Sequence, residues 1–326
     1  MSGLSYVLPV RTSAADDLAE LTSYLLWLSG RVELIVVDGS DPPVFSRNAL
    51  LWAGLGRHVP PRPGLRFSNG KVDGVVTGVE LAATPNVVVA DDDVRYDERA
   101  LQTMEELLDR YDLVRPQNYF DPLPWHALWD TGRTLLNRSF AADYPGTLGV
   151  SRELFLRVGG YDGNAMFENL EMIRTMEVAG GSSIAPLDLF VRRIPPDARH
   201  FLSQRTRQAY DDLAQPWRLA LFLSIGPAAL AAARRRPALL PVGALAIVAL
   251  AERGRRRERG TEVFPPQASA MAPLWVGERA LCVWIALVHR VLGGVPYRGK
   301  RIRVAAHSRR AIRRRLRDVE QGRSRP

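Results

Sequence analysis

The segment LSYVLPVRTSAADDLAELTSYLLWLSGRVELIVVDGSD, residues 4–41, decides the fold. Its apolar run at 4–10 predicts a buried strand, and the run at 32–37 predicts a second one. Between them, Ser13 is a suitable N-cap and an acidic pair follows it, so we expect a helix that begins there and ends at Gly30. A strand–helix–strand unit of this kind places its two strands parallel, which predicts an α/β domain.

The α/β pattern continues along the chain to about residue 200. The expected elements are a proline- and glycine-rich loop at 57–70, helices at 72–83, 98–110, 151–158 and 167–179, and strands at 86–90 and 112–116. Residues 117–150 contain aromatic residues, prolines and glycines without a clean periodicity, and long segments of this kind are often binding loops.

Three aspartates, Asp91, Asp92 and Asp93, directly follow the valine-rich strand. Three carboxylates at one strand end repel one another unless a cation lies there, and Mg²⁺ or Mn²⁺ is commonly held by one or two carboxylates together with a diphosphate. If the strand geometry continues, Asp91 and Asp93 share a face. Ligands of such sheets bind beyond the carboxyl ends of the strands, where Arg11 and Asp38 also lie, so we favour a metal–nucleotide site over a solvated acidic turn.

The net charge of +9 is unevenly distributed. Residues 1–215 carry a net charge of −8, residues 216–295 carry +7 and residues 296–326 carry +10. This division argues against nucleic-acid binding by the first two-thirds and points to an anionic surface, a membrane or RNA, contacted by the basic tail. One cysteine, Cys282, excludes an intrachain disulfide, and the N-terminal sequence lacks a signal-peptide pattern, so we expect the chain to stay in the cytoplasm.

Two uncharged apolar runs, 219–233 and 237–251, flank Arg234–Arg236. Fifteen helical residues reach about 22 Å, short of the ~30 Å hydrocarbon core, so we favour a re-entrant hairpin or interfacial helices over full spanning or a soluble helical subdomain. Residues 271–292 fit an amphipathic interfacial helix, and the arginines of 311–319 would add electrostatic attraction to anionic lipid. The expected organisation is therefore a catalytic domain, an apolar helical membrane-associated region and a basic tail.

Residues 4–215 resemble the family 2 glycosyltransferases of the GT-A fold, and among them the chain resembles a membrane-associated, actinobacterial-type member. The resemblance is carried by the order and spacing of seven motifs: LSYVLPVR (4–11), VELIVVDGSD (32–41), SNGKVDGVVTGVELA (68–82), VVVADDDV (87–94), YPGTLGVSRELFLRVGGYD (144–162), FENLEMIRTMEVAGG (167–181) and SQRTRQ (203–208). It implies a Rossmann-like nucleotide-diphospho-sugar transferase domain.

The resemblance also implies residue roles. The residues expected to bind the nucleotide sugar are Arg11, Asp38, Lys71, Asp91 and Asp92. Asp93 is the foremost candidate ligand for Mg²⁺ or Mn²⁺, with Asp91 contributing directly or through water and His200 as a further candidate. In the DxD motif of this family, the metal neutralises charge on the departing diphosphate.

The catalytic base is where the chain departs from the family pattern. The family carries Glu-Asp, with the aspartate assigned as base, whereas this chain has Glu168-Asn169, and asparagine does not accept a proton at neutral pH. Either Glu168 or Glu171 takes the role, since positions three apart on a helix face one cleft.

The acceptor side is expected to involve a QxxRW-like motif and one aromatic residue. Its members are Gln204, Arg205, Arg207 and Trp125. The arginines suit phosphate oxygens, but Gln208 replaces the motif's tryptophan. Trp125 either stacks on a sugar or packs in a core with Trp129, four residues on.

Taken together, the sequence predicts an inverting glycosyltransferase at the cytoplasmic face of the cell membrane. It would move a sugar from a nucleotide-sugar donor to a lipid, a polyprenyl phosphate or a lipid-linked glycan, with no nucleic-acid partner. One alternative is a non-catalytic scaffold that binds nucleotide sugars, motivated by Asn169. The other is a nucleotidyltransferase, although the first strand is not followed by a glycine-rich phosphate loop.

Overall fold

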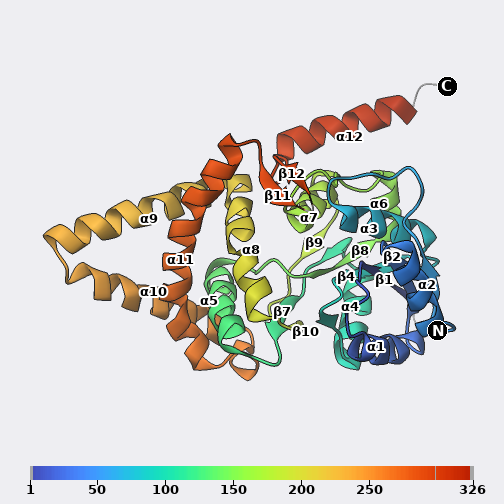
Figure 1. The fold of residues 1–326 in the computed structure, drawn as a ribbon, viewed down its shortest axis with the longest axis horizontal. Coiled ribbons are helices and arrows are strands. Elements are labelled where there is room, and N and C mark those ends of the chain that lie inside the picture. Colours follow the sequence, from blue (N-terminus) through green and yellow to red (C-terminus); the bar gives the residue numbers. More distant parts are fainter. Residues whose placement is uncertain (1–2, 298, 324–326) are drawn as a thin grey trace. The chain divides into compact units, whose positions relative to one another are not determined.

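The computed structural model describes residues 3–297 and 299–323, and the chain forms two compact units (Figure 1). Unit 1 comprises Met1–Arg115, Pro145–Ala185 and His307–Pro326, and unit 2 comprises Pro116–Tyr144 and Pro186–Ala306. The divisions expected at residues 215 and 295 do not coincide with these units. Two segments of the expected catalytic domain belong to unit 2, and the end of the basic tail belongs to unit 1.

Unit 1 is built on a seven-stranded sheet of order β3-β2-β1-β4-β8-β6-β9. Its strands are β1 (Leu4–Val10), β2 (Glu33–Asp38), β3 (Arg57–Val59), β4 (Asn86–Ala90), β6 (Leu113–Val114), β8 (Thr147–Ser151) and β9 (Ser183–Ile184), with the short β5 (Val94–Arg95) outside it. β1 pairs in parallel with β2 and β4, β8 runs antiparallel to β4 and β6, and β6 pairs in parallel with β9. The expected α/β architecture is confirmed for this unit.

The helices of unit 1 connect these strands. They are α1 (Ala19–Ser29), α2 (Pro42–Leu51), α3 (Gly70–Leu81), α4 (Glu98–Leu108), α6 (Arg152–Arg157), α7 (Glu168–Val178) and α12 (Arg309–Arg323). Helix α3 lies unusually close to β1: a Cβ at Gly78 would approach Val7 Cγ1 to 2.2 Å, and one at Gly74 would approach Pro9 Cβ to 2.7 Å. Two glycines four residues apart thus let α3 pack directly on the central strand.

Because β1 has β2 on one side and β4 on the other, the chain reverses its direction of winding at β1. The register pairs Val10 with Asp38 and Val7 with Val89, so β1, β2 and β4 end at the same edge of the sheet. Open α/β sheets bind ligands at such a switch point, beyond the carboxyl ends of the strands. This edge therefore positions the candidate site.

Unit 2 is mainly helical. Its elements are β7 (Gln117–Phe120), α5 (Trp125–Phe140), β10 (Phe190–Arg193), α8 (Ala198–Tyr210), η1 (Asp211–Ala214), α9 (Pro216–Arg235), α10 (Leu239–Arg256), η2 (Gly260–Glu262), α11 (Pro266–Val291), β11 (Val295–Tyr297) and β12 (Lys300–Ile302). Strands β7 and β10 pair in parallel, and α5 packs against α10 and α11. Its core includes Leu135, Phe264 and Ala272 in one cluster and Phe222 and Trp275 in another.

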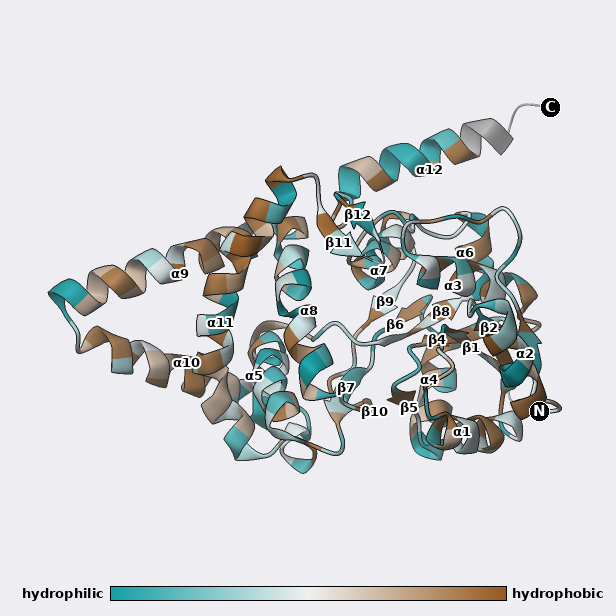
Figure 2. Ribbon diagram, in the orientation of Figure 1, coloured by the Kyte–Doolittle hydropathy of each residue, from teal (hydrophilic) through white to brown (hydrophobic). Residues whose placement is uncertain are grey.

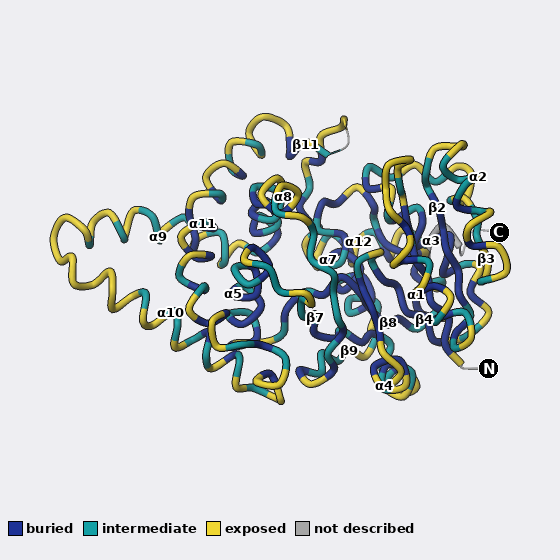
Figure 3. The backbone as a smooth tube through the Cα atoms, turned by 60° about the horizontal axis from the view of Figure 1, so that its bottom comes forward, coloured by how far each residue is buried: buried dark blue, intermediate teal, exposed yellow. Residues whose placement is uncertain are grey.

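Helices α9, α10 and α11 expose much of their apolar surface. Figure 2 shows their hydrophobic residues, and Figure 3 shows that the α9–α10 hairpin is largely exposed, in contrast to the buried strands of unit 1. By length and composition, α9 and α11 are each able to cross a membrane, with mean hydropathies of 1.3 and 1.5. Only 6% of the apolar window of α9 is buried, against 39% for α11, which also serves as a core helix of unit 2.

Two expectations about local structure are wrong. The first helix begins at Ala19, because Asp16 bonds the backbone N–H and hydroxyl of Ser13 and holds the preceding residues in a turn. Residues 117–150 are not a long loop: they form β7, α5 and part of β8. The buried face of α5 includes the polar residues Asp130, Thr134 and Arg138. A pattern of apolar residues at helical spacing therefore does not predict this helix.

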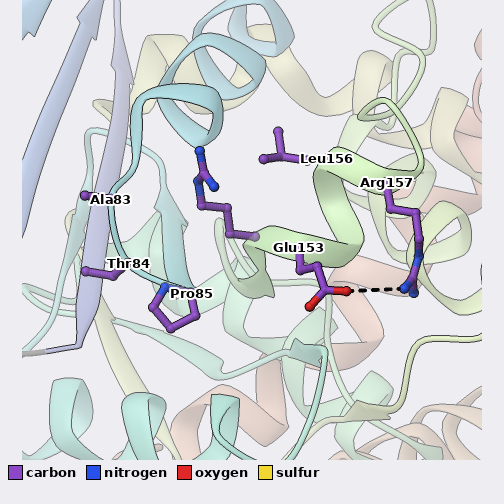
Figure 4. A pocket seen from close by; sticks show the side chains of 7 residues that line it. Ala83, Thr84, Pro85, Glu153, Leu156 and Arg157 are labelled. Carbon is purple, nitrogen blue, oxygen red and sulfur yellow. Dashed lines mark ion pairs between the residues drawn. The ribbon is translucent and has the colours of Figure 1, made fainter.

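A pocket of unit 1 lies beside the start of β4 (Figure 4). It is lined by the segment Ala83–Pro85 and by residues of α6, including Glu153, which forms an ion pair with Arg157 at 3.6 Å. Because Pro85 immediately precedes β4 and the aspartates follow it, this pocket lies at the opposite end of the strand from the candidate site.

Candidate functional site

The aspartates Asp91–Asp93 leave β4 in a turn. The Asp91 N–H donates to the Gly146 carbonyl at 2.9 Å, and the Val94 N–H closes the turn on the Asp91 carbonyl at 3.1 Å. The strand therefore ends before them, and the expected alternation that places Asp91 and Asp93 on one face does not apply. The Asp91 side chain keeps 21% of its surface exposed, which leaves it accessible at the sheet edge.

Lys71 links this turn to helix α7. It lies in the first turn of α3, whose N-cap is Asn69, and its Nζ is 2.5 Å from both Asp91 Oδ1 and Glu168 Oε1. Burial lowers the pKa of Lys71, but the two carboxylates outweigh that effect and raise its pKa above the ordinary value. One ammonium group thus separates two carboxylates that would otherwise repel each other.

Glu168 begins α7 and is almost completely buried, at 7% exposure. Its Oε2 accepts a hydrogen bond from the Tyr161 hydroxyl at 3.0 Å, while Oε1 contacts Lys71. Burial and the neighbouring Glu168 raise the pKa of Tyr161 well above its ordinary value, so the phenol remains a donor. Gly159 and Gly160, both at positive φ, form the turn that delivers Tyr161.

Tyr161 is not among the site residues expected from the sequence. The only signal was the Gly-Gly-Tyr-Asp turn at 159–162, which is compatible with many folds.

Glu171 has other hydrogen-bond partners than Glu168. Its side chain is fully buried, and it accepts hydrogen bonds from the His307 backbone N–H at 2.7 Å and His307 Nδ1 at 3.1 Å. Glu171 therefore holds the C-terminal segment of the chain, and the expectation that both acids face one cleft stays a prediction. Asn169 is also engaged, since its amide donates to the Pro145 carbonyl at 3.0 Å.

Asp38 lies at the expected strand end, but its carboxylate is buried and fully engaged. It accepts hydrogen bonds from the Ser40 N–H at 2.8 Å and the Asn48 amide at 2.8 Å, and His58 Nε2 lies 3.1 Å away. Burial raises the pKa of Asp38, but these hydrogen bonds outweigh it and lower the pKa to about 2. A direct contact with a nucleobase would require Asp38 to exchange one of these partners.

The other expected donor-side residues lie at the same sheet edge. Arg11 follows β1 and is exposed, with Nη2 3.3 Å from Asp41 Oδ1. Asp92 is exposed and its backbone carbonyl accepts a hydrogen bond from Arg95 at 2.6 Å, whereas Asp93 is half-buried. Their roles toward a nucleotide sugar or a metal stay predictions.

The expected acceptor-side residues all belong to unit 2. Arg205 is buried there, and its guanidinium contacts Asp130 at 2.9 Å and Glu278 at 2.6 Å. Because these two carboxylates and Gln208 take up its donors, Arg205 joins α5, α8 and α11, a structural role that the sequence analysis did not foresee.

The remaining unit 2 candidates are more accessible. His200 is exposed on α8 and contacts Gln204, and Arg207 lies over the ring of Tyr297 at 5.6 Å. Trp125 is 55% exposed, and its ring centroid lies 6.2 Å from that of Trp129. It therefore packs against Trp129 and also keeps an exposed surface. Whether these residues act with those of unit 1 stays a prediction.

The carboxylates at the end of β4 suit a metal that is held jointly with a substrate. Within residues 3–297 and 299–323, no three His, Cys, Asp or Glu side chains are arranged to hold a metal by themselves. Mg²⁺ normally needs only one or two carboxylates when phosphates complete its coordination, and the turn at 91–93 offers that donor set. The residues therefore fit Mg²⁺ or Mn²⁺ bound together with a diphosphate.

No family model and no curated protein matches the chain. Among solved structures, the chain is similar to a mannosyltransferase from Pyrobaculum calidifontis in complex with GDP-mannose and Mn²⁺, with 16% identity, a TM-score of 0.46, and coverage of 90% of this chain and 76% of that chain.

Two further solved structures are similar over 63% of this chain. One is glucosyl-3-phosphoglycerate synthase from Mycobacterium tuberculosis with Mn²⁺, UDP-glucose and phosphoglyceric acid, at 18% identity, 77% of that chain and a TM-score of 0.45. The other is mannosyl-3-phosphoglycerate synthase from Rubrobacter xylanophilus, at 19% identity, 70% of that chain and a TM-score of 0.43. Similarity at this level is too distant to assign an activity to this chain.

Proposed function

We propose that this protein is a metal-dependent, inverting glycosyltransferase of the GT-A type that uses a nucleotide-sugar donor. The observation that carries the proposal is the cluster in which Lys71 lies 2.5 Å from both Asp91 and Glu168, beyond the carboxyl end of β4. A cation, an accessible carboxylate and a buried carboxylate at the switch point of an α/β sheet suit the binding of a diphosphate beside a proton acceptor.

The donor would bind at the edge where β1, β2 and β4 end. Asp91 and Asp93 would hold Mg²⁺ or Mn²⁺, which when bound neutralises charge on the leaving diphosphate. Lys71 supplies a compact positive charge for the same phosphates, and the exposed Arg11 offers a forked donor at the end of β1. Asp38 organises the loop after β2 by accepting a hydrogen bond from the Ser40 N–H.

In the transfer step, the acceptor hydroxyl oxygen attacks the anomeric carbon and its proton passes to Glu168. The bond between the anomeric carbon and the phosphate oxygen breaks, and its electron pair leaves with the nucleoside diphosphate. Tyr161 and Lys71 each donate to one carboxylate oxygen of Glu168 and thereby fix the plane of the base. Glu168 is preferred to Glu171 because the latter is engaged by His307.

The proposed acceptor is a lipid, a polyprenyl phosphate or a lipid-linked glycan at the cytoplasmic face of the cell membrane, as in membrane-associated, actinobacterial-type family 2 enzymes of the cell envelope. The support is unit 2. Helix α9 has 20 residues, about 30 Å of helix, and it exposes large apolar side chains such as Trp217 and Leu230. Helix α11 exposes Leu281 and Trp284. On the acceptor side we propose Gln204, Arg207 and Trp125, without Arg205.

A donor panel tests the proposal. Purified full chain is incubated with nucleotide sugars, Mg²⁺ or Mn²⁺ and membrane lipid extract, and products are identified by mass spectrometry. We expect one donor to yield a glycosylated lipid, and Glu168→Gln to lower the rate about 10³-fold while nucleotide binding persists. Glu153→Gln, which changes an exposed acid on α6, is the matched control and should behave as wild type.

The second candidate function is a non-catalytic nucleotide-sugar scaffold, which Asn169 favours because it replaces the acid of the family pattern. Donor binding without transfer or donor hydrolysis, in wild type as in Glu168→Gln, would establish the scaffold and refute the enzyme.

A further inference from the structure

Helix α12 is docked on unit 1 along an apolar and hydrogen-bonded face. Ile312 and Leu316 are buried, at 1% and 9% exposure, and the helix packs against α7. Immediately before it, the Arg174 guanidinium donates to the His307 carbonyl at 2.8 Å. The Arg315 guanidinium donates to Thr175 Oγ1 at 3.3 Å. The part of the basic tail from His307 to the end of the described helix therefore belongs to unit 1.

The opposite face of α12 is a stripe of four arginines. Arg310, Arg313, Arg314 and Arg317 are all exposed, and their spacing of three, four and seven residues places them on one side of the helix. The described part of the chain provides no hydrogen bond or ion pair to these four guanidinium groups, whereas the neighbouring Arg309 pairs with Glu177. In Figure 2 the helix is predominantly hydrophilic.

We propose that this arginine stripe docks unit 1 on anionic lipid headgroups. Each basic residue near an anionic membrane strengthens binding roughly fivefold, so four of them together contribute about 10³-fold. Stable attachment generally takes two signals, and the exposed apolar helices of unit 2 supply the other one. Each unit then has its own contact with the bilayer, one electrostatic and one apolar.

The composition of α12 favours a membrane over a nucleic acid. The stripe extends over eight residues, about 10 Å of helix, and the helix sequence RRAIRRRLRDVEQGR contains no aromatic residue on which a base could stack. Four guanidinium groups on one straight face match a planar array of phosphates, and their buried counterparts Ile312 and Leu316 keep that face turned away from the protein.

Docking through α12 would also set the height of the catalytic helix above the headgroups. The segment preceding α12 is joined to Glu171, which lies one helical turn from Glu168 on α7. This consequence rests on the proposed function, whereas the lipid contact itself does not require any transfer reaction.

The test measures contact between α12 and lipid in the full chain. A fluorophore is attached at Asp318→Cys, an exposed position beside the stripe, in a Cys282→Ser background. The protein is placed in nanodiscs of phosphatidylcholine alone or with about 30% phosphatidylglycerol, each containing a headgroup-linked quencher. We expect quenching in the anionic discs, little in the neutral discs, and loss of quenching in about 0.5 M salt.

Arg313→Gln/Arg317→Gln should shift the contact equilibrium roughly 30-fold and abolish most of the quenching. The matched control is Arg99→Gln/Arg110→Gln, which removes two exposed arginines from α4 and its end and should leave the quenching unchanged. Circular dichroism and thermal melting verify that both double variants fold.

Equal quenching in neutral and anionic discs, or quenching that persists in the stripe variant, would overturn the proposal. Binding of a single-stranded RNA that depends on the stripe, without stripe-dependent quenching, would assign the arginines to nucleic acid instead. Because no sugar is transferred in the assay, its failure is distinct from failure of the proposed enzyme.

Discussion

Replacing His307 with alanine removes one of the two hydrogen bonds that Glu171 of α7 accepts from the C-terminal segment. The His307 backbone N–H donates to Glu171 Oε2 at 2.7 Å, and its Nδ1 lies 3.1 Å from Oε1. The backbone bond survives the substitution and the imidazole bond does not. Since Glu171 is completely buried, one of its oxygens loses its partner in a place that water reaches poorly.

The magnitude follows from the charge and exposure of the pair. A hydrogen bond between charged groups contributes about 1.5–3 kcal/mol, and the His307 side chain keeps 31% of its surface exposed, which favours the lower end of that range. We therefore expect His307→Ala to lower the free energy of opening of α12 by about 1.5 kcal/mol where the imidazole is protonated. Where it is neutral, the hydrogen bond to the Glu171 carboxylate lacks the attraction between opposite charges, and its loss costs roughly 1 kcal/mol.

The effect depends on pH in a defined direction. The hydrogen bond to Glu171 raises the pKa of His307 above 6.5, although burial opposes it. A raised folded-state pKa contributes stability that is fully present below the unfolded value of 6.5 and is lost as the pH rises through the folded value. Asp162, 3.9 Å away, acts in the same direction as Glu171, and Arg315 opposes them.

Amide hydrogen exchange of α12 in the full chain measures this opening locally, which avoids assuming that two units unfold together. The protection of α12 should fall more in His307→Ala at about pH 5.5 than at about pH 9, after correction for intrinsic exchange. His307→Gln keeps an uncharged donor but lacks the titrating imidazole, so its loss of protection should be smaller than that of His307→Ala at both pH values and should also be larger at about pH 5.5. An equal loss for His307→Ala at both pH values, or unchanged protection, would refute the reasoning.

Three further substitutions test the packing and the site. Gly78→Ala places a Cβ 2.2 Å from a methyl group of Val7 and should lower the free energy of unfolding, measured by denaturant melts, by about 2 kcal/mol. In the control variant Gly30→Ala the added Cβ meets no atom within 4 Å, so the free energy of unfolding should not fall. Tyr161→Phe removes a buried hydrogen bond to the proposed base and should lower kcat about tenfold, with an unchanged donor KM. A change in the donor KM alone would contradict a positioning role for Tyr161. Lys71→Met should weaken UDP or GDP binding about tenfold by calorimetry in the presence of Mg²⁺, and unaltered affinity would remove Lys71 from the phosphate site.

Local sequence patterns anticipated the elements whose buried residues are apolar. The strands at 4–10, 32–37 and 86–90 were predicted because valine, leucine and isoleucine line both faces of the sheet. Helix α5 was missed because its buried positions repeat Asp130, Thr134 and Arg138 at helical spacing. These polar side chains are stabilised by partners elsewhere in unit 2, which no local pattern reveals.

The sequence predicts individual residues of the site but not which of them contact one another. Asp91, Lys71 and Glu168 were each identified from short motifs, but the contact between Lys71 and Glu168 joins residues 97 positions apart. The choice between Glu168 and Glu171 depended on a bond from Glu171 to His307, 136 positions away. One-turn spacing on a helix predicted a shared face, but it did not predict that the two acids bind different partners.

The net charge of the tail is best compared with the net charge of the unit to which the tail belongs. Residues 307–326 carry a net charge of +6 and belong to unit 1, whose other segments carry −8, while unit 2 carries +11. The tail therefore nearly neutralises unit 1 overall, although Glu171 and Glu177 face one side of the segment and the four arginines of the stripe face the other. The bond to the buried Glu171 is screened weakly by salt, whereas exposed charges are screened strongly. Raising the ionic strength should consequently separate α12 from lipid at a lower salt concentration than it separates α12 from α7. Loss of both contacts at the same salt concentration would show that both depend on the same electrostatic interaction.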